Sequence, residues 1–286
     1  MKKIMIAFVS CLILCSSIRA DTSVWKVSKN GAELYLGGTC HILRDSDYPL
    51  PEEFDQAYAK SEIIVFETDI GKMNSPELQQ KILNKMVYAD GTSLKDHLSA
   101  ETYEMLNRVC DKNGIPLASL NSFKPVMVML PLAIMELKKL GIKEEGVEMR
   151  YYRRNLQDKK PVLKLETVDE QIDIISSMGA GNEDDFVRQS LDELNRIKEI
   201  FELIINHWKK GKDEDLYRLY LESEKRDYPE IYRTILKDRN DAWLPKIESF
   251  MATPEKEFVL VGFAHLVGED GILEQLRRRG YQVKKY

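Results

Sequence analysis

The chain has 286 residues, with 42 basic and 47 acidic side chains and a net charge of −5. This length suits one large or two small domains, and an apolar fraction of 43% is enough for a buried core. The acidic balance argues against nucleic acid as the main partner.

Residues 1–20 resemble a secretory signal peptide: two lysines precede an apolar run from Ile4 to Ile18, and Ala20 ends the segment. Removing it leaves 39 basic and 47 acidic residues, a net charge of −8. We therefore expect an exported protein, periplasmic or secreted, whose mature chain forms a single domain over residues 21–286. A lipoprotein is the alternative, because Cys11 lies in a partial lipid-attachment motif, and lipidation would add membrane association.

Two apolar runs at the start of the mature chain predict a β-hairpin. Val24 to Ser28 and Glu33 to Leu36 are joined by a loop that contains Asn30-Gly31, a pair typical of tight hairpin turns. The second run continues into two glycines and then His41. A histidine is thus expected just after a strand.

Two further strands are predicted to end on carboxylates. The apolar run that ends at Glu67 is suited to a strand with both faces buried. Pro161 to Glu166, PVLKLE, predicts another strand of this kind. Glu67 and Glu166 therefore occupy the same type of position as His41.

The middle of the chain, about residues 75–250, is predicted to be a helical insert. Val126 to Leu137 predicts a kinked interior helix, too short for a membrane span, that could line a substrate groove. Gly146 begins another helix, which carries Glu148. Glu183 to Lys210 has one continuous apolar stripe and predicts one long helix for the core or a subunit contact.

Near the C-terminus the run FVLVGFAHLV repeats the pattern of LYLGGTCHIL without a gap, which places Gly38 over Gly262 and His41 over His265. Each copy is a G-x-x-H sequence after a predicted strand. Glycine permits close backbone approach, and ligands of open α/β sheets bind beyond the strand ends. The chain has four histidines, so the paired motifs predict that these two converge on one site. Strands at both ends of the chain around a helical middle predict an α/β fold with a mixed central sheet.

These residues resemble the TraB/GumN family, which includes the Tiki proteins of animals. The resemblance rests on LYLGGTCH, IVFETD, GVE, LKLET, RNDAW and VGFAHLVGEDGILEQLRRRGYQV, spread over nearly the whole mature chain. It implies a compact α/β fold with both G-x-x-H loops at one site and, in the Tiki branch, metal-dependent peptidase activity with manganese or cobalt. By this resemblance the metal-site residues are His41, Glu67 and His265, while Glu148, Glu166 and Arg239 support the pocket. Gly268 lies three residues beyond the second histidine.

Two imidazoles and a carboxylate suit a divalent metal that activates water and polarises a carbonyl group. We expect hydrolysis of a peptide or a small amide substrate, with one glutamate as base and Arg239 steadying the developing oxyanion or a substrate carboxylate. The alternative from another class is a non-catalytic periplasmic protein that binds metal, haem or a small ligand.

Two other catalytic arrangements remain open at this point. His41 and His265 could act as acid and base without a metal, or Cys40 could be a nucleophile. Cys40 and Cys110 could instead form a disulfide in an oxidising compartment.

Overall fold

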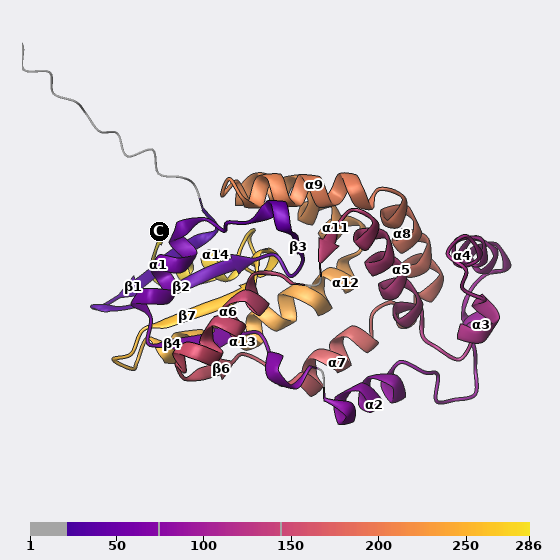
Figure 1. The fold of residues 1–286 in the computed structure, drawn as a ribbon, viewed down its shortest axis with the longest axis horizontal. Helices are drawn as coiled ribbons and strands as arrows, with labels where there is room; N and C mark the ends of the chain where they lie inside the picture. Colours follow the sequence, from indigo (N-terminus) through magenta and orange to yellow (C-terminus); the bar gives the residue numbers. More distant parts are fainter. Residues whose placement is uncertain (1–21, 74, 144) are drawn as a thin grey trace, which may run out of the picture.

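The computed structural model describes residues 22–73, 75–143 and 145–286. The predicted signal peptide and Cys11 lie outside the described residues. The molecule is elongated, with a β-sheet toward one end and helices toward the other (Figure 1). In the described part of the chain, no helix is long and apolar enough to cross a bilayer.

The central sheet has six strands in the order β6-β4-β7-β2-β1-β8. β6, β4, β7 and β2 run parallel to one another, whereas β1 is antiparallel to β2 and to β8. This confirms the predicted mixed α/β fold with strands from both ends of the chain. The strands are β1 (Val24–Lys29), β2 (Ala32–Thr39), β4 (Ile63–Phe66), β6 (Val162–Lys164), β7 (Glu257–Gly262) and β8 (Gln282–Lys285), and a separate two-stranded sheet pairs β3 (Leu43–Arg44) with β5 (Ile142–Lys143).

The predicted hairpin is confirmed. β1 and β2 pair antiparallel from Val24 opposite Gly37 to Lys29 opposite Ala32. The two turn residues between them, Asn30 and Gly31, both have positive φ, 53° and 90°. A primed two-residue turn requires this geometry, and Asn-Gly adopts it at low cost.

Helices make up most of the chain between β4 and β7, as predicted. Short 3₁₀ segments are η1 (Asp45–Asp47), η2 (Ile70–Lys72), η3 (Leu117–Leu120) and η6 (Phe263–His265), and two π-helical segments are η4 (Tyr217–Leu221) and η5 (Arg233–Lys237). The α-helices are α1 (Glu52–Lys60), α2 (Pro76–Lys85), α3 (Leu94–His97), α4 (Ala100–Lys112), α5 (Pro125–Lys139), α6 (Val147–Asp158), α7 (Val168–Ser176), α8 (Glu183–Asn195), α9 (Ile197–Trp208), α10 (Asp213–Leu216), α11 (Glu222–Asp227), α12 (Pro229–Tyr232), α13 (Asp238–Phe250) and α14 (Ile272–Arg278).

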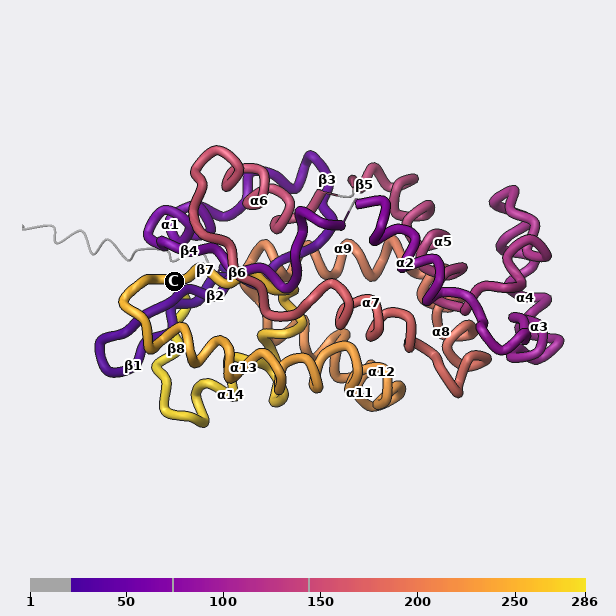
Figure 2. Tube along the Cα trace, turned by 90° about the horizontal axis from the view of Figure 1, so that it is seen from below, coloured from indigo at the N-terminus to yellow at the C-terminus, as the bar shows by residue number. Residues whose placement is uncertain are grey.

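The sheet lies between two layers of helices. Figure 2 shows α1 and α6 on one side of the strands and α13 and α14 on the other. On the first side, Phe54 of α1 and Tyr151 of α6 each pack edge-on against Phe258 of β7, with ring centroids 6.3 and 5.8 Å away. Burial of such aromatic side chains is a main source of folding free energy, so this core fixes the strand ends in place.

The helices farther from the sheet have a buried cluster of their own, which includes Leu106, Val128 and Val187. Cys110 belongs to this cluster, whereas Cys40 belongs to the core around the sheet, and both thiols are free. The suggested Cys40–Cys110 disulfide is therefore absent from the structure.

Two helix predictions need correction. The stripe from Glu183 to Lys210 forms two helices, α8 and α9, separated at Arg196 (φ −108°, ψ 8°). A periodic apolar pattern does not reveal such a break when both helices bury the same face. The helix over Val126 to Leu137 is formed, as α5, but it is not fully interior, because Leu130 is 50% exposed.

A buried carboxyl group at the start of β7 gives the first prediction. Glu257 is 1% exposed, its Oε2 has no hydrogen-bond partner, and its Oε1 lies 3.4 Å from the Thr253 hydroxyl. Burial raises the pKa of Glu257 from 4.5 to about 7. Between pH 4.5 and about pH 7 the folded chain keeps a proton on Glu257 that the unfolded chain has lost. The free energy of unfolding therefore falls as the pH rises through this range.

We therefore expect Glu257→Gln to unfold with a free energy roughly 1–3 kcal/mol higher than the parent at pH 8, and with little difference at pH 4.5. Urea unfolding at both pH values measures this. Glu255→Gln, at an exposed position two residues earlier, is the matched control and should change little. An equal effect of Glu257→Gln at both pH values would contradict the assignment.

Candidate functional site

The four parallel strands end at the same edge of the sheet, and a predicted site residue follows each of them. Glu67 comes directly after β4, and His41, Glu166 and His265 come two or three residues after β2, β6 and β7. This edge is where parallel α/β sheets place their ligands. The repeated G-x-x-H stretches lie on neighbouring strands, because β2 pairs with β7 in parallel.

His41 is the most accessible of these side chains, with 63% of its surface exposed. Its Nδ1 lies 2.7 Å from Oε1 of Glu148, which also accepts a hydrogen bond from the Thr39 hydroxyl. The negative charge of Glu148 raises the pKa of His41 above its usual value. A carboxylate on one ring nitrogen orients the imidazole and leaves the other nitrogen for a ligand.

Gly146 brings Glu148 to His41. The N-terminus of α6 contacts the loop after β2, where the Val147 N–H donates to the Cys40 carbonyl at 3.1 Å. A Cβ at Gly146 would lie 2.2 Å from the backbone carbonyl carbon of His41. Glycine is therefore required there for the helix to approach this closely.

Glu67 is buried, and both of its oxygens are hydrogen-bonded. Oε1 accepts from the Gly262 N–H at 2.7 Å, and Oε2 accepts from Nη2 of Arg239, also at 2.7 Å. Burial alone would raise the pKa of Glu67, but the neighbouring imidazoles, Arg239 and the Gly262 N–H together lower it to about 2. Glu67 is thus held as a carboxylate.

Arg239, the second residue of α13, uses all five of its N–H donors inside the protein. Nη2 contacts Glu67 and Glu166, Nε contacts Glu166, and Nη1 contacts His265 and the Ile235 carbonyl, all at 2.7–3.2 Å. A guanidinium has five N–H donors, so none is left for substrate. The predicted role of Arg239 as an oxyanion or carboxylate clamp does not fit this arrangement; it positions the carboxylates instead.

Glu166 is a partner of Arg239 rather than a free acid or base. Its two oxygens receive the guanidinium in a bidentate pair, and the Trp243 indole N–H donates to Oε2 at 3.2 Å. The Arg239 guanidinium also lies over the Trp243 ring, 4.5 Å from its centroid. Burial raises the pKa of Glu166 even so, which makes its charge dependent on Arg239.

His265 lies beside the same arginine and is 3% exposed. Its Nδ1 is 2.7 Å from Oδ1 of Asn240, and its Nε2 is 3.0 Å from Nη1 of Arg239. A guanidinium can only donate, so Nε2 accepts and Nδ1 carries the proton. Burial lowers the pKa of His265 to about 3, which keeps it neutral.

Both nitrogens of His265 are therefore occupied by protein groups. The structure brings His265 to the site, as the motif pairing predicted, but as a support for Arg239 and not with a nitrogen free to bind a metal. The predicted acid–base pair of His41 and His265 lacks a free second imidazole for the same reason.

The glycines of the two motifs allow the strand ends to pack closely. A Cβ at Gly262 would lie 3.1 Å from Nε2 of His41, and one at Gly38 would lie 3.2 Å from Cα of Phe263. Gly268 acts elsewhere: it has φ +80°, and a Cβ there would lie 2.1 Å from the Tyr217 ring. Gly262 thus borders the site, while Gly268 supports the packing of η4.

Within residues 22–73, 75–143 and 145–286, one group of side chains could hold a metal ion: His41, Glu67 and Glu148 offer ligand atoms that all lie within 4.8 Å of one another. Compared with the predicted set, Glu148 takes the place of His265. The charges also fit, since the carboxylates of Glu67, Glu148 and Glu166 with one Arg239 leave −2, which a divalent cation neutralises when the imidazoles are neutral.

Cys40 does not fit a catalytic role. It is 7% exposed, and burial raises the pKa of its thiol well above the usual value. A thiolate is the reactive form, so burial of this thiol disfavours a nucleophile at this position.

Sequence reasoning missed Thr39 and Asn240 as contributors to the site. Thr39 lies within the LYLGGTCH motif and Asn240 within RNDAW. The sequence therefore identified both motifs but did not indicate that these two residues contact the site. Their functions depend on partners 109 and 25 residues away, Glu148 and His265, which periodicity cannot reveal.

Comparison with known proteins gives one match. The sequence model of the TraB/PrgY/gumN family covers residues 23–285. No curated protein and no solved structure matches the chain.

Proposed function

Because the chain belongs to the TraB/PrgY/gumN family and its strand ends gather His41, Glu67 and Glu148, we propose that it is a metal-dependent hydrolase of peptide or amide bonds. The observation that carries this proposal is an exposed imidazole beside two buried carboxylates, with ligand atoms close enough to share one ion. Manganese suits this oxygen-rich donor set, and cobalt is the other metal that the resemblance to the Tiki branch implies.

In this proposal His41, Glu67 and Glu148 hold the ion, which when bound supplies an activated water and polarises the substrate carbonyl. The bonds to Gly262 and Arg239 keep Glu67 ionised and fixed. Glu148 has an oxygen, Oε2, with no hydrogen bond in the described part of the chain, whereas both oxygens of Glu67 and Glu166 are bonded. Oε2 is therefore the oxygen with which we assign Glu148 to hold the ion.

Glu148→Gln tests this role. The variant should keep its fold and lose at least about 100-fold in hydrolysis of a peptide library supplied with manganese. Glu145→Gln is the matched control, because Glu145 lies just before α6, is 48% exposed, pairs with Arg153 at the surface and accepts a hydrogen bond from Tyr48 at its backbone carbonyl. Chelator should abolish activity in the parent, and added metal should restore it. Activity that resists chelation, or survives in Glu148→Gln, would reject the proposal.

A binding protein without turnover is the second candidate. It is favoured by one observation: Arg239 and His265 have no donor free to stabilise a developing oxyanion. This candidate predicts stoichiometric metal binding by the purified chain and no cleavage of any peptide in the library. The same experiment therefore separates the two.

Export remains part of the proposal and rests on the pattern of residues 1–20. A mature protein that begins near Asp21 in the cell-envelope fraction would support it. A full-length chain in the cytoplasm would contradict it.

A further inference from the structure

A cavity of about 520 Å³ lies among α5, α8 and α9. Its volume lies in the usual range for small-molecule pockets. Ile42, which follows His41, lines one part of it, and so does Ile235, whose carbonyl accepts a hydrogen bond from Arg239. The cavity is thus lined by two neighbours of site residues, while the proposed metal ligands themselves do not line it.

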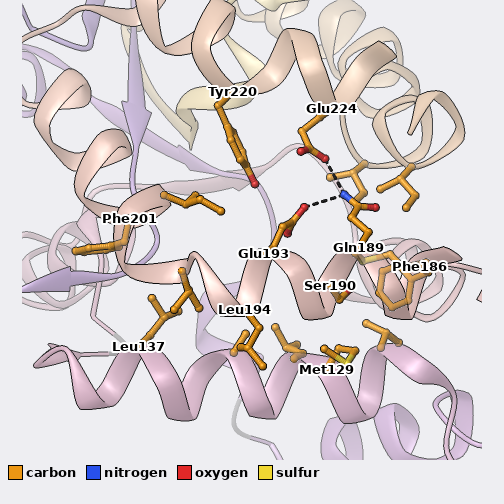
Figure 3. Close-up of a pocket in the computed structure, with 18 of the residues that line it drawn as sticks. Met129, Leu137, Phe186, Gln189, Ser190, Glu193, Leu194, Phe201, Tyr220 and Glu224 are labelled. Atoms are coloured by element: carbon orange, nitrogen blue, oxygen red, sulfur yellow. Dashed lines mark hydrogen bonds between the residues drawn. The ribbon is translucent and has the colours of Figure 1, made fainter. Parts of the chain in front are cut away.

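Most of the lining is aliphatic or aromatic. Figure 3 shows Met129 and Leu137 on α5 facing Leu194 on α8 and Phe201 on α9 across the open space. Leu194 and Phe201 belong to the apolar stripe that the sequence suggested for core or subunit packing, whereas Met129 and Leu137 belong to the helix that it suggested could line a substrate groove. A stripe that lines a cavity instead is available to an apolar ligand.

One region of the wall is polar and acidic. Gln189 Nε2 donates to Glu193 Oε1 at 2.7 Å and to Glu224 Oε2 at 2.9 Å. The remaining amide oxygen, Oε1 of Gln189, is buried and has no partner. Figure 3 shows these three side chains and Tyr220 reaching into the cavity. Buried polar atoms are rarely left unpaired without a reason.

No basic side chain projects into the acidic region among the described lining residues, and Arg196 acts on Glu193 from outside the cavity. Among the described residues that line the cavity, none is Lys or Arg. Burial raises the pKa of Glu193, and burial together with Glu193 raises that of Glu224 to about 7. Two acids that share one amide group and face one apolar space offer acceptors to a hydrogen-bond donor with positive charge, whereas Oε1 of Gln189 is covered by the protein.

Two π-helical segments form part of this wall. Tyr220 belongs to η4 and Ile235 to η5. Such segments occur often at functional sites, because the extra residue per turn redirects side chains. Here they direct one side chain each at the cavity.

We propose that this cavity binds a linear apolar group that ends in a protonated amine, with the ammonium held by Glu193 and Glu224. The proposal goes beyond hydrolysis, since it concerns binding and stands whether or not the neighbouring site turns over a substrate. If both proposals hold, an apolar chain with an amino end is the part of the substrate that this protein selects.

Octylamine, octanol and octanoate are probes that share a chain length and differ in charge. Calorimetry with the whole mature chain at pH 7.5 should give affinity in the order octylamine, octanol, octanoate, with octylamine at least about tenfold tighter than octanol. Equal binding of octanol, or tighter binding of octanoate, would overturn the proposal. Hydrolytic activity does not enter this readout, so failure here is separate from failure of the proposed enzyme function.

Two variants test whether the probes bind in this cavity. Glu193→Gln should weaken octylamine about tenfold and leave octanol unchanged, whereas Glu104→Gln, an exposed glutamate on α4, should change neither. Ala133→Phe should fill the apolar part and weaken both probes. A normal unfolding transition for each variant confirms its fold. If octylamine still binds Ala133→Phe and Glu193→Gln as it binds the parent, the site lies elsewhere and the proposal is wrong.

Discussion

Replacing His41 by alanine is expected to abolish manganese and cobalt binding and, with it, hydrolysis, while the fold remains. His41 supplies the only imidazole of the three side chains that could hold an ion, and its exposed ring contributes little to the core. Loss of one protein ligand should weaken metal affinity by roughly 100-fold or more. Calorimetric titration with each metal, together with peptide cleavage, measures both effects.

His207→Ala is the matched control for this experiment. His207 lies on α9, where its Nδ1 bonds to the Leu203 carbonyl within the same helix, so metal binding should be unaffected. Unchanged metal content in His41→Ala would show that the ion, if bound, does not use this loop.

Replacing Arg239 by methionine is expected to cause the largest loss of stability. The guanidinium is 10% exposed and is shared by Glu67 and Glu166. Removing it leaves two buried carboxylates without a counter-charge, which should lower the unfolding free energy by roughly 3–5 kcal/mol. Urea unfolding measures the change, and Arg233→Met, at an exposed arginine of η5, is the control.

The loss in Arg239→Met should also depend on pH. Without Arg239 the pKa of Glu166 in the folded state, already raised by burial, rises further, and Glu67 loses one of the charges that lower its pKa. The folded variant then holds protons that the unfolded chain releases as pH increases. The destabilisation should therefore be smaller at pH 5 than at pH 8. Equal losses at both pH values would mean that the pairing with Arg239 is not what stabilises these carboxylates.

The positions of the strand ends were predictable because short stretches of neighbouring residues determine them. Apolar runs that end on Glu67 and Glu166, and the repeated G-x-x-H before His41 and His265, were enough to place four residues at one edge of a parallel sheet. The roles of these residues were less predictable. They depend on which polar groups the helices bring against each strand end.

His265 illustrates this limit. Its neighbours Arg239 and Asn240 come from α13 and occupy both ring nitrogens, so a residue expected to bind metal is a support instead. Glu148 shows the converse, because the close approach of α6 at Gly146 brings it to His41. Neither contact has a periodic signal in the sequence. The apolar stripe of α8 and α9 likewise could not reveal whether it faces a packed core or a cavity.

The most direct test of the proposed metal centre is a crystal structure of the mature chain soaked in manganese, with the ion located from its anomalous signal. We predict one peak at about 2.2 Å from ligand atoms of His41, Glu67 and Glu148, with His265 still bonded to Arg239 and Asn240. A peak coordinated by His265, or a well-ordered site with no manganese at all, would contradict the account.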